Sequence, residues 1–450
     1  MTETVEIPVW IVVLALLLAG FGALDRVLVP SLRWFLRRRM ERVVVRLNQR
    51  LQRPIEPFKL MRRQDRIVRL VFDPKVMQAV ADQAAETGVP QNVVFEQARR
   101  YAREIVPGFS ATLYFGFATW AARALSRVLY RVRIGRMDAA LDAIDPKATV
   151  IFVINHRSNM DYVLVTWLVA RRGALSYAVG EWARVWPLSA MIRAMGAYFI
   201  RRGRSNPLYR KVLERHVQMA TADGITQALF PEGGLSLDGR IGPAKLGLLH
   251  YIIDGFDPAG RDVIFVPVGL SYDRVPEDLL LVQAGKDGTR RFRPRLLRVA
   301  WEALVIGLKR ASGHLYLFGS AGVGFGPPVS LRAHLAAGRD LESLAADLME
   351  EVGRAVPVLP VPLCAAAILE HTTEEALAER LLAQGAVMKL PPGGAAQARA
   401  EGRAVLTARG VLGADGTPLP GKHDLLAFYA AQVRQRLEAP PDGNAATRRT

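Results

Sequence analysis

Ile154-Asn155-His156-Arg157-Ser158-Asn159-Met160-Asp161-Tyr162 joins a strand signal to a helix signal. The β-branched and aromatic run before it predicts a buried strand, and Ser158 or Asn159 is a typical residue to precede a helix. On one continuous helix, side chains five residues apart would point about 140° away from each other. His156 and Asp161 can therefore meet only if His156 lies in the turn and Asp161 in the first helical turn. The stretch predicts a strand–turn–helix junction with that geometry.

The predicted His–Asp pair has the composition of a general base. A carboxylate on one imidazole nitrogen fixes the tautomer and leaves the other nitrogen to take a proton from a hydroxyl. Taken alone, this spacing more often means a capping Asp and a hydrogen-bonded loop His. No Gly-x-Ser-x-Gly elbow occurs in the chain, which argues against a serine esterase.

Strand signals and helical patterns alternate on both sides of this junction, which is typical of an α/β layered fold. Residues 43–132 are predicted to be helical, residues 384–404 a Gly-, Ala- and Pro-rich loop, and the last residues a disordered tail. The predicted strands are Thr149–Ile154, Leu175–Val179, Ala197–Ile200, Gln227–Phe230, Val263–Val268 and Leu315–Phe318.

The first fifty residues combine an apolar segment with a basic cluster. Ile7–Leu24 carries no charge and is just long enough to span a bilayer. The arginine-rich residues 25–53 follow it, and the positive-inside rule then places the remaining chain in the cytoplasm. An interfacial helix or a buried hairpin is the alternative, because Pro8, Gly20 and Gly22 weaken a single rigid span. In each case the arginine cluster is expected at an anionic membrane surface.

The composition narrows the classes of partner and site. Lys and Arg number 60 against 42 Asp and Glu, so the net charge of +18 favours polyanions such as lipid head groups, nucleic acid or a phosphorylated substrate. The basic residues have no aromatic or helix-turn-helix context, so nucleic acid ranks last. The single cysteine, Cys364, lies in an apolar run and is expected to be a core thiol. Neither a disulfide framework nor a metal site is expected.

Three further segments accompany the His–Asp stretch in the order of one known family. They are Gly196–Arg202, Leu229–Arg240 and Val263–Val268. Together with Asn155–Asp161 they resemble the four motif blocks of the glycerolipid acyltransferases, most closely the bacterial glycerol-3-phosphate acyltransferases. The similarity covers roughly residues 95 to 435. It implies an α/β acyltransferase core with a mixed sheet flanked by helices, to which this chain adds an N-terminal helical region and a membrane anchor.

The resemblance implies acyl transfer without an acyl-enzyme intermediate and without a cofactor. His156 would activate the acceptor hydroxyl, Asp161 would orient His156, and the alkoxide would attack the thioester of acyl-CoA or acyl carrier protein. Negative charge developing on the carbonyl oxygen needs preorganised donors. Backbone N–H groups around Gly233 and Gly234, or at the helix start near Asn159, are candidates.

In the family, basic residues of the second and third blocks are associated with the acceptor phosphate. The resemblance carries this role over to Arg201 and Arg202, with Arg240 and Lys245 as nearby candidates. A guanidinium suits the role because it grips phosphate with paired hydrogen bonds. Without the neighbouring motif, an Arg pair at a strand end could equally be a solvated edge.

The third block leaves two questions open. Glu232, between a strand end and the glycines that follow it, could hold the phosphate-site arginines or the turn. Leu235 stands where an Arg usually follows the Glu-Gly-x triplet of the family. This departure leaves the acceptor less certain than the chemistry.

The expected product is 1-acylglycerol 3-phosphate, made at the cytoplasmic side of the inner membrane. Lysophosphatidate or dihydroxyacetone phosphate as acceptor is the alternative within the class, and an inactive lipid-binding scaffold is the alternative outside it. The predicted domains are an anchor at 1–24, an Arg-rich juxtamembrane and helical region at 25–132, the acyltransferase core at 133–370, a helical or loop region at 371–437 and a disordered tail at 438–450.

Overall fold

A computed structural model describes residues 8–9, 63–111, 113–135, 141–170, 174–180, 188–201, 206–288 and 318–438. The described residues from 63 onward belong to one compact unit, Glu56–Thr450. The predicted anchor, apart from Pro8 and Val9, the arginine-rich residues 25–53 and the tail beyond residue 438 lie outside the described ranges. Within those ranges, no helix combines the length and apolarity needed to cross a bilayer.

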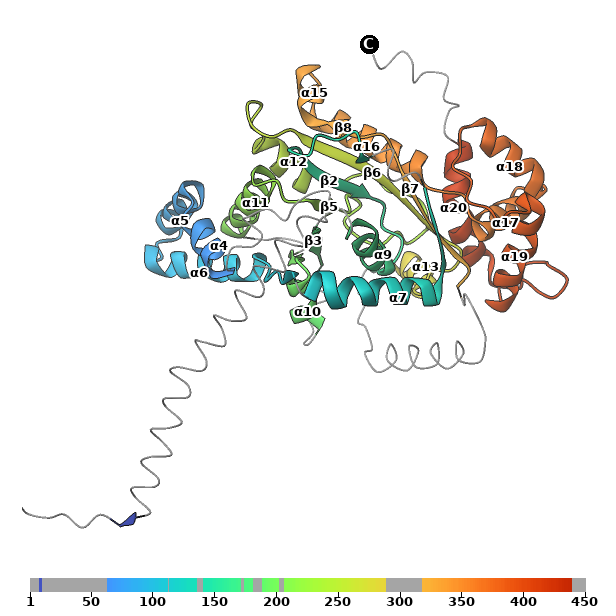
Figure 1. Ribbon diagram of the computed structural model, residues 1–450, viewed down its shortest axis with the longest axis horizontal. Coiled ribbons are helices and arrows are strands. Elements are labelled where there is room, and N and C mark those ends of the chain that lie inside the picture. Colours follow the sequence, from blue (N-terminus) through green and yellow to red (C-terminus); the bar gives the residue numbers. More distant parts are fainter. Residues whose placement is uncertain are drawn as a thin grey trace, which may run out of the picture. The chain divides into compact units, whose positions relative to one another are not determined.

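A mixed sheet forms the centre of this unit, flanked by helices as predicted (Figure 1). Its strands run in the order β1-β7-β6-β2-β5-β3-β4, and β8 pairs with β6. The pairs β6–β7 and β6–β8 are antiparallel, and the others are parallel. The strands are β1 (Arg131–Ile134), β2 (Thr149–Ile154), β3 (Ser176–Val179), β4 (Tyr198–Phe199), β5 (Gln227–Leu229), β6 (Val263–Tyr272), β7 (Ser320–Phe325) and β8 (Val329–Ser330).

The helices gather in groups around this sheet. In Figure 1 the N-terminal helices lie beside α11 at one end, and α17 to α20 form a cluster at the other. The N-terminal group is α4 (Arg63–Val71), α5 (Pro74–Thr87) and α6 (Gln91–Ile105), followed by the π-helix η2 (Leu113–Ala118) and α7 (Thr119–Leu129). Next come α9 (Met160–Val169), α10 (Leu188–Ala194), α11 (Pro207–Ala222), α12 (Gly247–Asp254) and α13 (Asp278–Asp287). The C-terminal helices are α15 (Leu331–Ala336), α16 (Leu341–Ala355), α17 (Pro360–Leu369), α18 (Glu374–Ala383), α19 (Gly394–Ala408) and α20 (His423–Glu438).

Strand β2 lies at the core of the sheet between β5 and β6. All six residues of its sequence TVIFVI are buried, as expected of a parallel strand covered on both faces. Each large apolar side chain buried in this way contributes about 1.5–3 kcal/mol. The strand is therefore a rigid base for the turn that follows it.

The predicted strand at Leu315–Phe318 needs correction. Residues 315–317 lie outside the described ranges, Phe318 lies in a turn, and the strand observed is β7, Ser320–Phe325. Its glycines are typical of a loop, but here their lack of a side chain lets the end of helix α16 lie directly against the sheet. A Cβ on Gly324 would lie 1.9 Å from the Ala355 carbonyl oxygen, and one on its β6 partner Gly269 would lie 2.2 Å from the Val356 nitrogen.

The predicted loop at residues 384–404 holds for residues 384–393 but is wrong beyond them, because α19 occupies Gly394–Ala408. The segment is rich in alanine, the strongest helix former, which outweighs its glycines. Gly402 serves packing inside this helix, since a Cβ there would lie 2.6 Å from the Cys364 sulfur on α17. Cys364 itself is buried in the core, as the sequence predicts.

Asp273, directly after β6, joins β7 to the C-terminal helices. Its carboxylate accepts the backbone N–H of Ser320 at 2.6 Å and that of Val361 at 2.8 Å. Burial raises its pKa to about 6, and the two hydrogen bonds only partly oppose that effect. The group is therefore a buried acid that titrates well above its ordinary range.

Candidate active site

The site forms where two parallel strands end side by side. Val153 near the end of β2 pairs with Leu229 at the end of β5, so the segments that follow both strands meet at one edge of the sheet. Asn155 continues the pairing of β2 with β6 through its side chain. Its amide nitrogen donates to the Leu270 carbonyl at 3.0 Å and its amide oxygen accepts the Leu270 N–H at 2.7 Å. The turn that begins at His156 is thereby fixed from its first residue.

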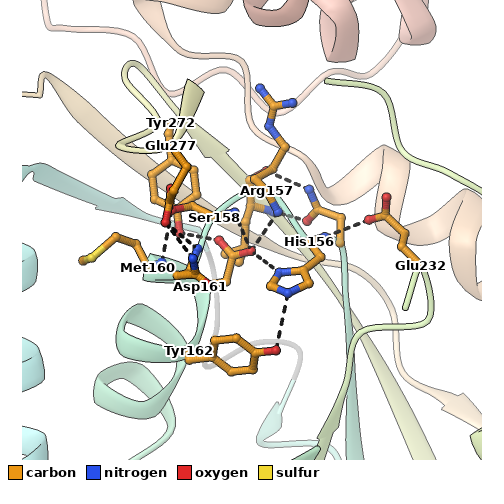
Figure 2. Close-up of polar contacts among 12 residues, drawn as sticks. His156, Arg157, Ser158, Met160, Asp161, Tyr162, Glu232, Tyr272 and Glu277 are labelled. Carbon is orange, nitrogen blue, oxygen red and sulfur yellow. Dashed lines mark hydrogen bonds and ion pairs between the residues drawn. The ribbon is translucent and has the colours of Figure 1, made fainter. Parts of the chain in front are cut away.

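His156 and Asp161 meet across this turn, as the spacing predicts (Figure 2). Imidazole Nδ1 lies 2.9 Å from Asp161 Oδ2, and both side chains are buried. The same oxygen accepts the backbone N–H groups of Arg157 at 2.7 Å and Ser158 at 3.0 Å. A carboxylate can only accept, so Nδ1 carries the proton and Nε2 presents its lone pair. His156 thus has the tautomer of a general base.

Aromatic rings surround the Nε2 side of the imidazole. The Phe230 ring lies 4.5 Å from the His156 ring, and the Tyr162 ring meets it edge-on at 5.3 Å. Tyr162 also stacks on Tyr177. Its hydroxyl lies 3.4 Å from Nε2, at the outer limit of a hydrogen bond (Figure 2).

Glu232 links the third motif segment to the turn that begins at His156. Its Oε1 accepts the His156 backbone N–H at 2.7 Å and its Oε2 accepts that of Gly242 at 3.1 Å. Burial raises the pKa of this carboxyl, while both hydrogen bonds oppose the rise. Of the two roles considered for Glu232, its hydrogen bonds are those of a residue that holds the turn.

Gly233 has a left-handed backbone with φ of 66°, and Lys245 lies against it. A Cβ on Gly233 would sit 2.7 Å from Lys245 Cδ. Two of the backbone N–H groups that were expected to stabilise the oxyanion already donate hydrogen bonds within the protein. The Gly233 N–H donates to the Phe230 carbonyl at 2.9 Å and the Asn159 N–H to Glu277 at 3.2 Å, while Gly234 is buried beside them.

Arg201 lies just after β4, separated from β2 by β5 and β3. Its guanidinium makes two hydrogen bonds to Glu104 on α6, at 2.9 and 2.6 Å, and lies over the rings of Tyr101 and Tyr209. The bond to Glu104 raises the pKa of Arg201, but the arginine side chain is 40% exposed. The carboxylate that Arg201 contacts is Glu104, which is not part of the His156–Asp161 pair.

The other predicted cations are placed differently. Arg240 pairs with Glu438 on α20 at 3.1 and 2.5 Å, again at the surface, and Lys245 is exposed. Arg202 lies outside the described residues. Arg201 and Arg240 therefore lie in separate ion pairs.

Arg157 of the turn points away from the imidazole and toward α20 (Figure 2). Its guanidinium carbon lies 4.4 Å from the centre of the Phe428 ring, and its NH2 group donates to the Phe428 carbonyl at 3.4 Å. Burial lowers the pKa of this guanidinium. Gly239 lies against the same guanidinium, because a Cβ on this residue would lie 2.9 Å from Arg157 NH1. The turn is thus packed directly against the C-terminal helices.

Two residues absent from the sequence prediction also contact the turn. The Tyr272 hydroxyl donates to Asp161 Oδ1 at 2.7 Å, and Glu277 accepts hydrogen bonds from Ser158 and Asn159 (Figure 2). The only sequence signal was the β6 strand pattern, which continues past Val268 to Tyr272. Among the described residues, no group of three or more His, Cys, Asp or Glu side chains is placed to hold a metal ion.

Comparison with known proteins supports the acyltransferase resemblance. Residues 137–271 match the family model named Acyltransferase. The chain is 27% identical over 350 residues to a glycerol-3-phosphate acyltransferase of Pseudoalteromonas atlantica, covering 72% of this chain and 41% of the relative. It is 29% identical over 309 residues to a putative acyltransferase of Mycobacterium tuberculosis, covering 65% of this chain and 47% of the relative. The chain thus spans less than half the length of either protein.

A solved structure, the 1-acyl-sn-glycerophosphate acyltransferase PlsC from Thermotoga maritima, aligns with 64% of this chain and 97% of its own. The sequence identity is 18% and the TM-score is 0.31, which does not establish a shared fold. The acyltransferase resemblance rests on the match of residues 137–271 to the Acyltransferase family model and on the curated relatives.

Proposed function

We propose that this chain, with its acyltransferase-family domain, is an O-acyltransferase that moves a fatty acyl group to the sn-1 hydroxyl of glycerol 3-phosphate. The donor would be acyl-CoA or acyl carrier protein. Support comes from the family match and from relatives named glycerol-3-phosphate acyltransferase. The alternatives within the class are lysophosphatidate, dihydroxyacetone phosphate or another lysophospholipid as acceptor.

The observation that carries this proposal is the buried contact of 2.9 Å between His156 Nδ1 and Asp161 Oδ2. Nε2 takes the proton of the acceptor hydroxyl while the hydroxyl oxygen attacks the thioester carbonyl. The tetrahedral intermediate then collapses, the carbon–sulfur bond breaks, and the departing thiolate takes the proton from Nε2. General-base assistance of this kind contributes about 10²–10⁴ in rate. Asp161 stabilises the imidazolium that forms between the two proton transfers.

The acceptor phosphate is assigned to the predicted cations, with Arg201 first. Its present partner, Glu104, is a carboxylate held by two charge-assisted hydrogen bonds, which is the geometry that a phosphate also accepts. The guanidinium is accessible because the Arg201 side chain is 40% exposed, whereas Glu104, only 13% exposed, would have to release it to a phosphate. Arg202, Arg240 and Lys245 remain candidates beside it. Leu235 supplies no charge, so a more apolar acceptor remains an alternative.

A membrane surface is the proposed partner and the proposed location is the cytoplasmic side of the inner membrane. The face formed by η2 and α7 supports this. Phe117 and Trp120 are 53% and 66% exposed, with ring centroids 6.3 Å apart. Arg123 and Arg127 are exposed on the same helix, and the sequence of α7 contains no acidic residue. Aromatic and arginine side chains together suit an anionic lipid surface.

The deciding experiment is an acyl-transfer assay of the purified protein. Glycerol 3-phosphate, dihydroxyacetone phosphate and lysophosphatidate are each offered with acyl-CoA and with acyl carrier protein. His156→Ala and Asp161→Asn serve as the matched inactive controls. Preferred acylation of lysophosphatidate would select the alternative acceptor. Binding of lipid vesicles without transfer to any acceptor would select the inactive scaffold.

A further inference from the structure

Asp161 uses its two oxygens for different partners. Oδ2 faces His156 Nδ1 and two backbone N–H groups of the turn, whereas Oδ1 faces the hydroxyl of Tyr272 at 2.7 Å. Rotation about the last bond of an Asp side chain is soft, so hydrogen bonds on Oδ2 alone leave the carboxylate plane less well defined. The Tyr272 hydroxyl is therefore placed to set the angle at which Oδ2 meets the imidazole.

Tyr272 is held firmly enough for this purpose. It is fully buried, and its ring lies 5.4 Å from the ring of Tyr130, whose own hydroxyl bonds elsewhere, to the Arg274 carbonyl at 2.7 Å. Burial and the Asp161 charge raise the pKa of Tyr272 well above its ordinary value, so the hydroxyl stays protonated and donates.

Glu277 fixes the other side of the same turn. Its Oε2 accepts the Ser158 hydroxyl at 2.8 Å, and its Oε1 accepts the side-chain and backbone N–H groups of Asn159 at 2.9 and 3.2 Å. Ser158 in turn supplies one of the N–H groups on Asp161 Oδ2. Glu277 therefore acts on Asp161 through one intervening residue.

We propose that Tyr272 and Glu277 are positioning residues that hold the His156–Asp161 pair in its catalytic geometry. Both lie just beyond residue 271, where the match to the family model ends. Neither contacts the imidazole in the described structure, so each acts through Asp161 or the turn. The inference rests on the proposed acyl transfer, because it assigns these residues a part in that reaction.

The main test compares Tyr272→Phe with Tyr130→Phe. Both variants lose one buried tyrosine hydroxyl and keep the ring, but only the first loses a hydrogen bond to Asp161. We expect kcat of Tyr272→Phe to fall about ten- to a hundredfold, the scale of a small misplacement of a catalytic group. Its KM values for donor and acceptor should stay unchanged. Tyr130→Phe should keep its kcat and show a comparable loss of thermal stability.

Glu277→Gln and Glu277→Ala form the second arm. Gln keeps an amide oxygen that can accept from Asn159, whereas Ala removes every acceptor. We therefore expect Gln to retain much of the kcat that Ala loses. This arm decides the matter if Tyr272→Phe does not fold.

A spectroscopic measurement separates this inference from the proposed function. The downfield proton resonance of His156 Nδ1–H should shift or broaden in Tyr272→Phe and stay in place in Tyr130→Phe, whatever the enzyme acylates. Wild-type protein that acylates no acceptor would overturn the proposed function alone. An active Tyr272→Phe with wild-type kcat and an unchanged resonance would overturn the positioning role. Equal kcat losses in both tyrosine variants would also overturn it.

Discussion

The catalytic turn at residues 155–161 and the surface arginines Arg201 and Arg240 are built in opposite ways. In the turn, His156 and Asp161 are buried, and both oxygens of the Asp161 carboxylate have donors within the protein. Arg201 and Arg240 are each about 40% exposed; Arg201 binds the carboxylate of Glu104, which is 13% exposed, and Arg240 binds that of Glu438, which is 53% exposed. The first region is preorganised, whereas the partners of the second can be exchanged.

This contrast separates chemistry from recognition. Because His156 and Asp161 are buried and already hydrogen-bonded to each other, no solvent or side chain has to reorganise when an acceptor hydroxyl binds. The pair of Arg240 with Glu438 is exposed on both sides, and such pairs contribute at most about 1 kcal/mol, so a charged ligand can replace that carboxylate. Substitutions in the turn should therefore reduce turnover, and substitutions at the arginines should alter acceptor use.

The largest effect is expected from His156→Ala. Loss of the general base should reduce acyl transfer by about 10²–10⁴, while the thermal unfolding temperature stays close to that of the wild type. Steady-state kinetics and a thermal melt measure both quantities. A folded His156→Ala protein with wild-type turnover would falsify the mechanism.

The buried acid Asp273 should make stability depend on pH. Its folded pKa of about 6 lies above the ordinary 3.8, so the folded state holds the proton more tightly and is favoured at low pH. This contribution, about 3 kcal/mol from the difference between the two pKa values, is present below pH 4 and lost as pH rises through 6. Urea unfolding of wild type and Asp273→Asn at pH 4 and pH 7 tests it. Parallel profiles for the two proteins would contradict the assignment.

Arg201→Ala should weaken use of glycerol 3-phosphate by about tenfold to a hundredfold, because charge-assisted hydrogen bonds contribute about 1.5–3 kcal/mol each. The KM of the acyl donor should change much less. Arg240→Ala, which removes an equally exposed, doubly bonded arginine, is measured beside it as the rival candidate for the phosphate. Equal effects of the two variants on the acceptor would show that Arg201 has no special place in phosphate binding. Leu235→Arg should improve use of the phosphate acceptor if that position faces it.

The smallest effect is expected for the stability of Arg240→Ala. Its pair with Glu438 is exposed on both sides, at 42% and 53%, so the free energy of unfolding should fall by less than about 1 kcal/mol. Chemical denaturation of wild type, Arg240→Ala and Glu438→Ala provides the comparison. A loss of several kcal/mol would mean that the arginine supports the docking of α20.

Local sequence pattern predicted much of the sheet and the contact within the catalytic turn. Five strand signals correspond to β2 through β6, because short and mainly apolar runs are buried there. Residues 320–325 were not predicted as a strand, because they contain glycines. These glycines leave room for α16 to lie against the sheet, and a contact between such distant segments leaves no local sequence pattern. The short strand β1 was missed within a helical prediction.

The residues of the site also divide into those that local sequence relates and those that only the fold brings together. His156 and Asp161 are five residues apart, so turn geometry alone relates them. Tyr272 and Glu277 lie more than a hundred residues further along the chain, and only strand pairing between β2 and β6 brings them to the turn. The ion pair of Arg201 with Glu104 depends on the packing of α6 beside β4, which the sequence does not reveal.

Asn155 has a consequence for how the chain avoids misfolding. Its side-chain amide forms both hydrogen bonds with Leu270 only when β2 and β6 pair in the native register. A slip of one residue would turn every side chain of β2 to the opposite face and would also break both bonds. Asn155 therefore penalises the slipped pairing at the residue next to His156, so a chain that folds out of register also loses its base.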